Sequence, residues 1–408
     1  MPSTLPDGSP APADGSLPPA ALAEFGTRPF GVYLHVPFCT TRCGYCDFNT
    51  YTADELGSAS GASRTSWADA ATVELRLARR VLGTSDVPVS TIFVGGGTPS
   101  LLPAADLGRV IRAIRNEFGL APDVEISTEA NPESVGPAWF DGLLAAGFTR
   151  VSLGMQSARR HVLAVLDRVH TPGRPAEATA EARRAGFEHI NLDLIYGTPG
   201  ETLDDWRASV AAAIEAGPDH VSAYALIVEE GTRLAARIRR GELPAPDDDD
   251  LADKYESADD TLTEAGFSWY EVSNWTSSAT ARCRHNELYW TGGHWWGIGP
   301  GAHSHVGGTR WWNVKHPAAW AARLASGESP AHAREVLDAE TRRVERVLLE
   351  IRLADGLDTA ALDDAGRVAA SEILADGLVE PDHFAAGRLV LTRRGRLLAD
   401  AVVHRLLS

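Results

Sequence analysis

Three of the four cysteines of this 408-residue chain lie within one eight-residue segment. Cys39, Cys43 and Cys46 follow the pattern C-x3-C-x2-C, directly after a strand predicted at residues 32–36. Soft thiolate ligands select iron–sulfur clusters, zinc or copper(I). A structural zinc ion usually takes four ligands, and neither a fourth cysteine nor a suitably spaced histidine follows in this segment. Three thiolates on a four-iron cluster leave one iron without a protein ligand, so the pattern favours an iron–sulfur cluster with an open position.

Further groups that suit a ligand stand at the ends of later predicted strands. Residues 95–98 read Gly-Gly-Gly-Thr, and glycines let a backbone approach a ligand closely and expose its amides. Glu129, Gln156 and Asp193 stand at the ends of the next three strands. Chemistry in α/β barrels is located at the C-terminal ends of the strands, so we expect these groups to surround one ligand. His35, just before the cysteines, is expected to pack their loop.

Six short apolar runs alternate with amphipathic segments and position these groups. Strands alternating with helices imply parallel pairing with right-handed crossovers. One of the helices is predicted over residues 202–216, with Thr202 as its N-cap and Asp205 at the capping-box position. The sequence therefore predicts an α/β fold, a partial, TIM-like (β/α)6 barrel followed by a smaller α+β region. The strands are predicted at residues 32–36, 91–94, 124–128, 150–153, 189–194 and 220–225.

Changes in composition predict four regions along the chain. Residues 1–28 are rich in Pro, Ala, Gly and Ser without a hydrophobic period, which predicts a disordered tail. The barrel is predicted over 29–240, a Trp- and His-rich region over 241–334, and a helical C-terminal domain over 335–408. The order of elements in this last domain resembles a winged helix, and we favour a small packing domain over DNA binding. The acidic run at 247–250 is interpreted as a solvated helix start.

The overall composition bounds the class of protein. A hydrophobic content of 44% with 23% charged residues is typical of a soluble globular chain. No apolar stretch is long enough for a transmembrane helix, and the first basic residue is Arg28, so a secretory signal would lack its positive region. We therefore expect a cytoplasmic protein. The formal charge of −17 disfavours general nucleic-acid binding.

The cysteine segment resembles that of the radical S-adenosylmethionine (SAM) superfamily, and most of the chain is similar to the superfamily's HemN/HemW branch. Residues 153–157, 167–170 and 193–200, which read Leu-Gly-Met-Gln-Ser, Asp-Arg-Val-His and Asp-Leu-Ile-Tyr-Gly-Thr-Pro-Gly, carry the likeness to this branch. The resemblance implies that the three cysteines hold a [4Fe–4S] cluster whose fourth iron binds SAM. It implies SAM contacts from Tyr33, Gly96, Gly97, Thr98, Glu129, Gln156, Arg168 and Asp193.

Two features separate the members of this branch. Coproporphyrinogen III dehydrogenases have a fourth cysteine two residues after the third, and this chain has Phe48 there, as heme chaperones do. Residues 285–290, His-Asn-Glu-Leu-Tyr-Trp, resemble a heme-chaperone motif, which implies heme binding by His285. The other interpretation is structural, with His285 and Asn286 capping a loop. Weaker candidates for heme binding are His294, His303 and His305.

We therefore favour a heme chaperone that binds a [4Fe–4S] cluster, SAM and heme, and we assign no catalytic residue. The alternative is an oxygen-independent coproporphyrinogen III dehydrogenase, and a third candidate is another radical SAM enzyme. The resemblance implies heme-accepting partners such as respiratory-chain components, with peripheral membrane association through them. It also implies an electron donor and a cluster-dependent dimer.

Overall fold

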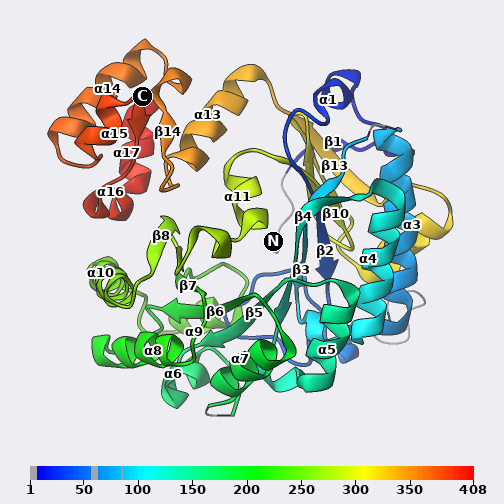
Figure 1. Ribbon diagram of the computed structural model, residues 1–408, viewed down its shortest axis with the longest axis horizontal. Helices are drawn as coiled ribbons and strands as arrows, with labels where there is room; N and C mark the ends of the chain where they lie inside the picture. Colours follow the sequence, from blue (N-terminus) through cyan, green and yellow to red (C-terminus); the bar gives the residue numbers. More distant parts are fainter. Residues whose placement is uncertain (1–6, 57–62, 85, 169, 172) are drawn as a thin grey trace.

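The computed structural model describes residues 7–56, 63–84, 86–168, 170–171 and 173–408. All six predicted strands form, and each pairs in parallel with the next in chain order. The partial barrel is thereby confirmed (Figure 1). Its strands are β2 (Phe30–Val36), β3 (Val89–Gly96), β4 (Leu120–Ala130), β5 (Arg150–Gln156), β6 (His189–Tyr196) and β7 (His220–Ala225).

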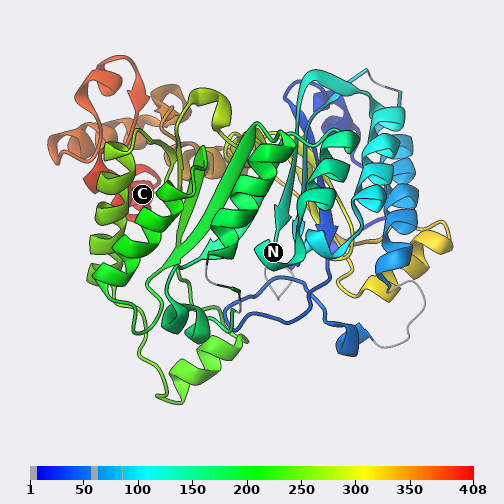
Figure 2. The same cartoon turned by 60° about the horizontal axis from the view of Figure 1, so that its bottom comes forward.

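Helices between these strands cover the outer face of the barrel (Figure 2). The predicted capping box is present, because the side chains of Thr202 and Asp205 each accept a bond from the other's backbone amide. The longer helices are α3 (Arg64–Leu82), α4 (Ala104–Phe118), α5 (Pro137–Ala146), α7 (Arg174–Ala185) and α8 (Leu203–Glu215). Shorter ones are α2 (Ala53–Leu56), η1 (Pro99–Leu101), η2 (Pro132–Ser134), α6 (Arg160–Val165) and α9 (Arg233–Arg239).

The two faces of the parallel strands differ in polarity because side chains alternate along each strand. One set, which includes Val32, Leu34 and Val36, belongs to the apolar core formed with the helices. The other set is largely polar, and hydrogen bonds join several of its members across neighbouring strands. Asn191 Nδ2 donates to Ser152 Oγ at 2.7 Å and to Ser222 Oγ at 2.9 Å. The barrel interior is therefore polar, as a binding site requires.

The region 241–334 is continuous with the barrel, because its strands extend both edges of the same sheet. Thirteen strands of the described residues form that sheet. Glu74 of α3 ties the extension in place, since its carboxylate accepts bonds from Gly299 N, Asn313 Nδ2 and Trp320 Nε1. On one edge lie β10 (His294–Ile298), parallel to β2, then β11 (His303–Val306), β12 (Thr309–Asn313), β13 (Ala331–Val336) and β1 (Ser9–Pro10). On the other lie β9 (Asn274–Thr276) and β8 (Ser268–Glu271), and the helices of the region are α10 (Asp248–Glu264), η3 (Ala279–Ala281), α11 (Arg284–Trp290) and α12 (Pro317–Ala325).

The predicted disordered tail is wrong for residues 7–28. Strand β1 pairs with β13, and α1 (Pro19–Glu24) begins with proline at its first position, where the missing amide costs no hydrogen bond. Leu17, Ala21 and Phe25 are buried. The apolar residues of the tail are too few for a period of their own, yet they cover the extended sheet. Residues 1–6 lie outside the described residues.

The C-terminal residues form a small helical unit with its own apolar core around Ile351, Ile373 and Val402. The described residues contain no helix with the length and apolarity needed to cross a membrane. The winged-helix interpretation of this unit stays a prediction. Its elements are α13 (Ala339–Glu350), β14 (Leu357–Asp358), η4 (Thr359–Ala361), α14 (Asp364–Ala375), α15 (Pro381–Ala385), β15 (Arg388–Leu389), α16 (Arg393–Leu397) and α17 (Ala399–Leu406).

A buried ion pair joins this unit to α10 of the region 241–334. The acidic run 247–250 forms the N-cap and first turn of α10, as predicted. Asp259 lies farther along the same helix. Its carboxylate accepts bonds from Arg396 Nη2 at 2.7 Å and from Trp275 Nε1 at 2.8 Å. The side chains of Asp259 and Arg396 are each 5% exposed.

Replacing Asp259 should loosen the C-terminal unit. In Asp259→Asn the guanidinium of Arg396 stays buried without a counter-charge, and such losses cost roughly 3–5 kcal/mol. We expect a lower melting temperature and faster limited proteolysis at the start of the C-terminal unit. The matched control is Asp260→Asn, which removes an exposed partner of Arg393. Equal melting temperatures for the two variants would contradict this role for Asp259.

Candidate metal and cofactor site

The three clustered cysteines lie on a loop whose two ends are held together. We call residues 37–51 the cysteine loop. Cys39 N donates to Tyr51 O at 3.0 Å, and Tyr51 N donates to Pro37 O at 2.7 Å. His35 Nε2 donates to the carbonyl of Asn49 at 2.8 Å, and its Nδ1 accepts from Tyr33 at 3.0 Å. Burial lowers the pKa of His35 to about 4, so the neutral ring packs the loop, as predicted.

Polar groups from the barrel approach the thiols of this loop. Thr98 Oγ1 lies 3.8 Å from Cys39 Sγ, and Arg168 Nη1 lies 3.9 Å from Cys43 Sγ. Such donors stabilise thiolates. Burial nevertheless raises the pKa of Cys39, and raises that of Cys46 to about 11. In the absence of metal these two thiols therefore hold their protons at pH 7, and metal binding would displace them.

The thiols line a cavity at the C-terminal ends of the strands, which we call the inner cavity. Its volume is about 400 Å³. Within the described residues no three Cys, His, Asp or Glu side chains converge on a point where one metal ion would sit. Three thiolates leave a structural zinc ion short of its usual fourth ligand, whereas they suit a four-iron cluster with one open iron.

The glycine turn after β3 packs directly on the cysteine loop. Gly97 N donates to Val36 O and Thr98 N donates to Phe38 O, both at 2.8 Å. A Cβ on Gly97 would lie 2.6 Å from Phe38 O, so this close approach requires glycine. Gly96, with φ of 109°, donates its amide to Glu129 Oε2 at 3.1 Å. The turn thus supports the loop and also holds a carboxylate of the inner cavity.

Two acids that line the inner cavity have raised pKa values. Burial and then the nearby Asp193 carboxylate raise the pKa of Glu129 to about 8. Burial also raises the pKa of Asp193, although Ser152 Oγ donates to it at 2.6 Å and Asn191 Nδ2 at 2.8 Å. A cationic group placed between these acids would favour their ionised forms. The inner cavity therefore suits a ligand with positive charge.

Gln156 and Arg168 meet on the wall of the inner cavity at the end of β5, the strand between those that carry the two acids. Gln156 has φ of 63°, a left-handed conformation that non-glycine residues rarely adopt and that clusters at functional sites. A Cβ on Gly154 would lie 2.7 Å from Gln156 Nε2 and 2.8 Å from Arg168 Nη2. Arg168 Nη2 donates to Gly154 O at 3.0 Å, while its Nε is buried without a hydrogen-bond partner in the described part of the chain. Arg168 thereby links this wall to Cys43.

Most of the predicted site residues therefore meet, and two lie elsewhere. Tyr33 is not among the residues that line the inner cavity. Its ring stacks on Phe93, with ring centres 6.4 Å apart. His285 lies nearer the amino ends of the strands and is 1% exposed. Its Nδ1 pairs with Thr91 Oγ1 and its Nε2 with Tyr289 Oη, both at 2.8 Å, and burial lowers its pKa to about 3. The ring of His285 is thus fully engaged in this conformation.

The structure adds an apolar rim that the sequence did not reveal. Phe48, Tyr224 and Ile227 line the inner cavity and are 43%, 44% and 68% exposed. Tyr224 stands near the end of the last barrel strand, where the strand-end rule that found Asp193 would also have placed it. Ile227 follows in a loop, and nothing in its neighbourhood marks it in the sequence. These three side chains add exposed apolar surface to the cavity that the thiols line.

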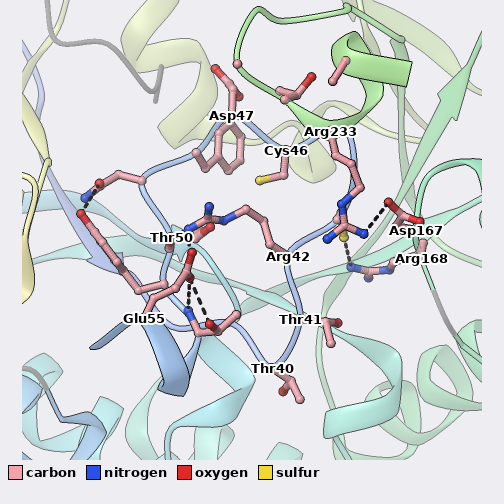
Figure 3. A pocket seen from close by; sticks show the side chains of 18 of the residues that line it. Thr40, Thr41, Arg42, Cys46, Asp47, Thr50, Glu55, Asp167, Arg168 and Arg233 are labelled. Carbon is pink, nitrogen blue, oxygen red and sulfur yellow. Dashed lines mark hydrogen bonds and ion pairs between the residues drawn. The ribbon is translucent and has the colours of Figure 1, made fainter. Parts of the chain in front are cut away.

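A larger open cavity lies against the same loop, and we call it the outer cavity (Figure 3). Its volume is about 1130 Å³, and Cys43, Cys46 and Phe48 line both cavities. Arg233 Nη1 pairs with Asp167 Oδ2 at 3.1 Å across its wall. Both cavities therefore adjoin the part of the cysteine loop that carries Cys43 and Cys46.

Comparisons with known proteins show the family of this chain. The model of the Radical SAM superfamily matches residues 33–213. A protein of Mycobacterium tuberculosis named heme chaperone HemW is 58% identical over 388 residues, which cover 95% of this chain and 97% of that one. The heme chaperone HemW of Bacillus subtilis is 30% identical over 384 residues, covering 91% and 97%. The solved coproporphyrinogen III oxidase HemN of Escherichia coli superposes with a TM-score of 0.79 at 22% identity, covering 95% and 92%, which shows a shared fold.

Glu129 predicts a particular dependence of stability on pH. Its pKa is about 8 in the folded chain against an ordinary 4.5, so between these values the unfolded chain has lost a proton that the folded chain retains. The free energy of unfolding should therefore fall as pH rises through this window. Glu129→Gln removes this loss, and its melting temperature should exceed that of the parent by roughly 1–3 °C near pH 8 and by less near pH 5. Parallel curves of melting temperature against pH would contradict the assignment.

Proposed function

Because this chain belongs to the HemW family of the radical SAM superfamily, we propose that it is a heme chaperone. In this proposal it binds a [4Fe–4S] cluster, SAM and heme, and transfers heme to acceptor proteins. The observation that carries the proposal is the likeness to HemW proteins along nearly the whole chain. Phe48 supports it, because a fourth cysteine would be expected at this position in a coproporphyrinogen III dehydrogenase.

The cluster would be held by Cys39, Cys43 and Cys46. When bound, it supplies an electron that cleaves SAM reductively. Thr98 and Arg168 would donate hydrogen bonds to the thiolates of Cys39 and Cys43. These bonds would stabilise the negative charge of the two sulfur atoms. The outer cavity gives an electron donor access to the loop without passage through the inner cavity.

SAM would occupy the inner cavity beside the cluster. Glu129 and Asp193 suit its ammonium and sulfonium charges, and the buried Nε of Arg168 suits its carboxylate. Tyr33 would act indirectly, since its hydroxyl holds His35 and thereby the cysteine loop. The proposed contacts are those of Gly96, Gly97, Thr98, Glu129, Gln156, Arg168 and Asp193.

Heme binding by His285 stays a proposal that requires a rearrangement. To ligate iron through Nε2, the ring of His285 must leave Tyr289 and become exposed. We further propose a cytoplasmic location, a cluster-dependent dimer, and respiratory-chain proteins as acceptors, reached at the membrane surface. In this account the cluster and SAM control heme transfer.

An assay of chain reconstituted without oxygen separates the chaperone from the dehydrogenase. One arm supplies coproporphyrinogen III, SAM and a reductant, and the other supplies heme and an apo-respiratory acceptor. We expect heme to move to the acceptor and no protoporphyrinogen to form beyond a single turnover. Multiple turnovers of decarboxylation would overturn the proposal, and the apolar rim of Phe48, Tyr224 and Ile227 would then be the wall for that tetrapyrrole.

Replacing Cys39, Cys43 and Cys46 together by Ala should abolish retention of iron and sulfide. Cys283→Ala is the matched control, because Cys283 is buried beside Glu125 and does not line the inner cavity. We expect the control to keep the absorption of a [4Fe–4S] cluster at full intensity. A cluster spectrum in the triple variant, or its loss in the control, would refute the site.

A further inference from the structure

The helix that carries His285 has little buried apolar surface of its own. Helix α11 packs between β3 and α13 (Figure 1), and two of its seven residues, His285 and Leu288, are buried. Gly292, with φ of 64°, and Gly293 follow the helix, and glycines tolerate a change of backbone direction. Segments with few buried apolar contacts open at a lower free energy than the core does. The position of α11 against the barrel therefore depends on its polar contacts.

A buried carboxylate of the barrel holds the first turn of α11. Glu125 of β4 is 6% exposed. Its Oε2 accepts a hydrogen bond from Arg284 N at 3.0 Å, and its Oε1 accepts one from His285 N at 3.1 Å. Cys283 stands at the N-cap of the helix, and its Sγ lies 3.7 Å from Oε1. Glu125 thus supplies from the sheet the acceptor that an N-cap serine or aspartate usually provides.

These bonds keep the ring of His285 in a slot of the barrel. The ring stacks on Phe93, with centres 5.4 Å apart and planes 18° apart. A Cβ on Gly31 would lie 3.3 Å from His285 Cε1 and 2.7 Å from Thr91 Oγ1, so the missing side chain provides room for the ring. Thr91 and Tyr289 occupy the two ring nitrogens. We call this arrangement the docked state of α11, and in it a heme iron has no access to Nε2.

A second buried carboxylate contacts the helix but also has another role. Glu271 of β8 accepts a hydrogen bond from Asn286 Nδ2 at 3.2 Å. The same carboxylate accepts from Ser273 N at 3.2 Å and from Asn274 Nδ2, so it also holds the turn between β8 and β9. The hydrogen bonds of Glu125 within the described residues all go to residues 283–285. Glu125 is therefore the carboxylate dedicated to docking α11.

We propose that Glu125 is a positioning residue for heme binding, which keeps α11 docked with His285 enclosed, and that heme binds the fraction of chains in which this helix is undocked. The inference rests on the proposed heme-chaperone function with His285 as the iron ligand. A ligand that binds one of two states has an apparent affinity reduced in proportion to the population of that state. Return of the helix to Glu125 would withdraw His285 from the iron and so favour release of heme to an acceptor.

Heme titration of the full-length chain, followed at the Soret band, tests this role. Glu125→Gln replaces one acceptor oxygen by an amide donor and removes the charge, so it should weaken docking. We expect the apparent affinity for heme to rise roughly fivefold or more, with the spectrum of the parent complex retained because His285 still ligates the iron. The matched control is Asp123→Asn, because Asp123 lies on the same strand and pairs with Arg284 at the surface. The control should change the affinity by less than about twofold.

Thr91→Val gives a second test that leaves Glu125 intact, and it carries the test if Glu125→Gln does not fold. This variant keeps the shape of the side chain and removes the hydroxyl that pairs with His285 Nδ1. It should also raise the apparent affinity for heme, because it destabilises the docked state alone. A weaker affinity in Thr91→Val would mean that His285 ligates iron from within its slot, and that result would contradict the inference.

Hydrogen exchange in residues 284–290 provides a readout that is independent of affinity. The amides of Arg284 and His285 are bonded to Glu125 and should exchange slowly in the heme-free parent. They should exchange roughly tenfold faster or more in the heme complex and in heme-free Glu125→Gln. Slow exchange in the heme complex, or unchanged or weaker heme binding by a folded Glu125→Gln, would overturn the inference while leaving heme binding intact. Failure of the parent itself to bind heme at one per chain would instead refute the proposed function.

Discussion

The parallel alignment of β2 to β7 is the constraint on which the site depends. Parallel strands end at the same rim, and alternation along each strand sends one set of side chains to the helices and the other to the interior. The apolar set supplies the core, so the interior is left free to be polar. The rim then brings Gly96, Glu129, Gln156 and Asp193 together from four different strands, although up to 97 residues separate them in the chain.

Several features of this site destabilise the folded chain locally. Two carboxyl groups share a cavity where burial raises the pKa values of both, and Gln156 has a left-handed backbone. Such features persist only where the surrounding structure holds them, and here hydrogen bonds from Ser152, Asn191 and the amide of Gly96 do so. A cationic ligand between the acids would remove the charge conflict. Ligand binding and stability are therefore coupled at this rim.

The sequence predicted the parts of the fold that repeat a local signal. All six barrel strands, the capped helix α8 and the convergence of strand-end residues follow from apolar periods and turn chemistry. The tail and the edge strands from 241–334 were not predicted to join the sheet, because these short strands form by pairing with distant segments, as β13 does with β1 and β10 does with β2. The environment of His285 also depends on the distant Thr91, so the motif alone could not show that its imidazole is engaged.

The central claim is that Cys39, Cys43 and Cys46 hold a four-iron cluster whose open iron faces a SAM cavity. Mössbauer spectroscopy of the reconstituted, iron-57-labelled chain, recorded with and without SAM, tests it most directly. The account predicts about four irons per chain in one cubane and a change at a single iron when SAM is added. Identical spectra with and without SAM, or iron bound as isolated ions, would contradict it.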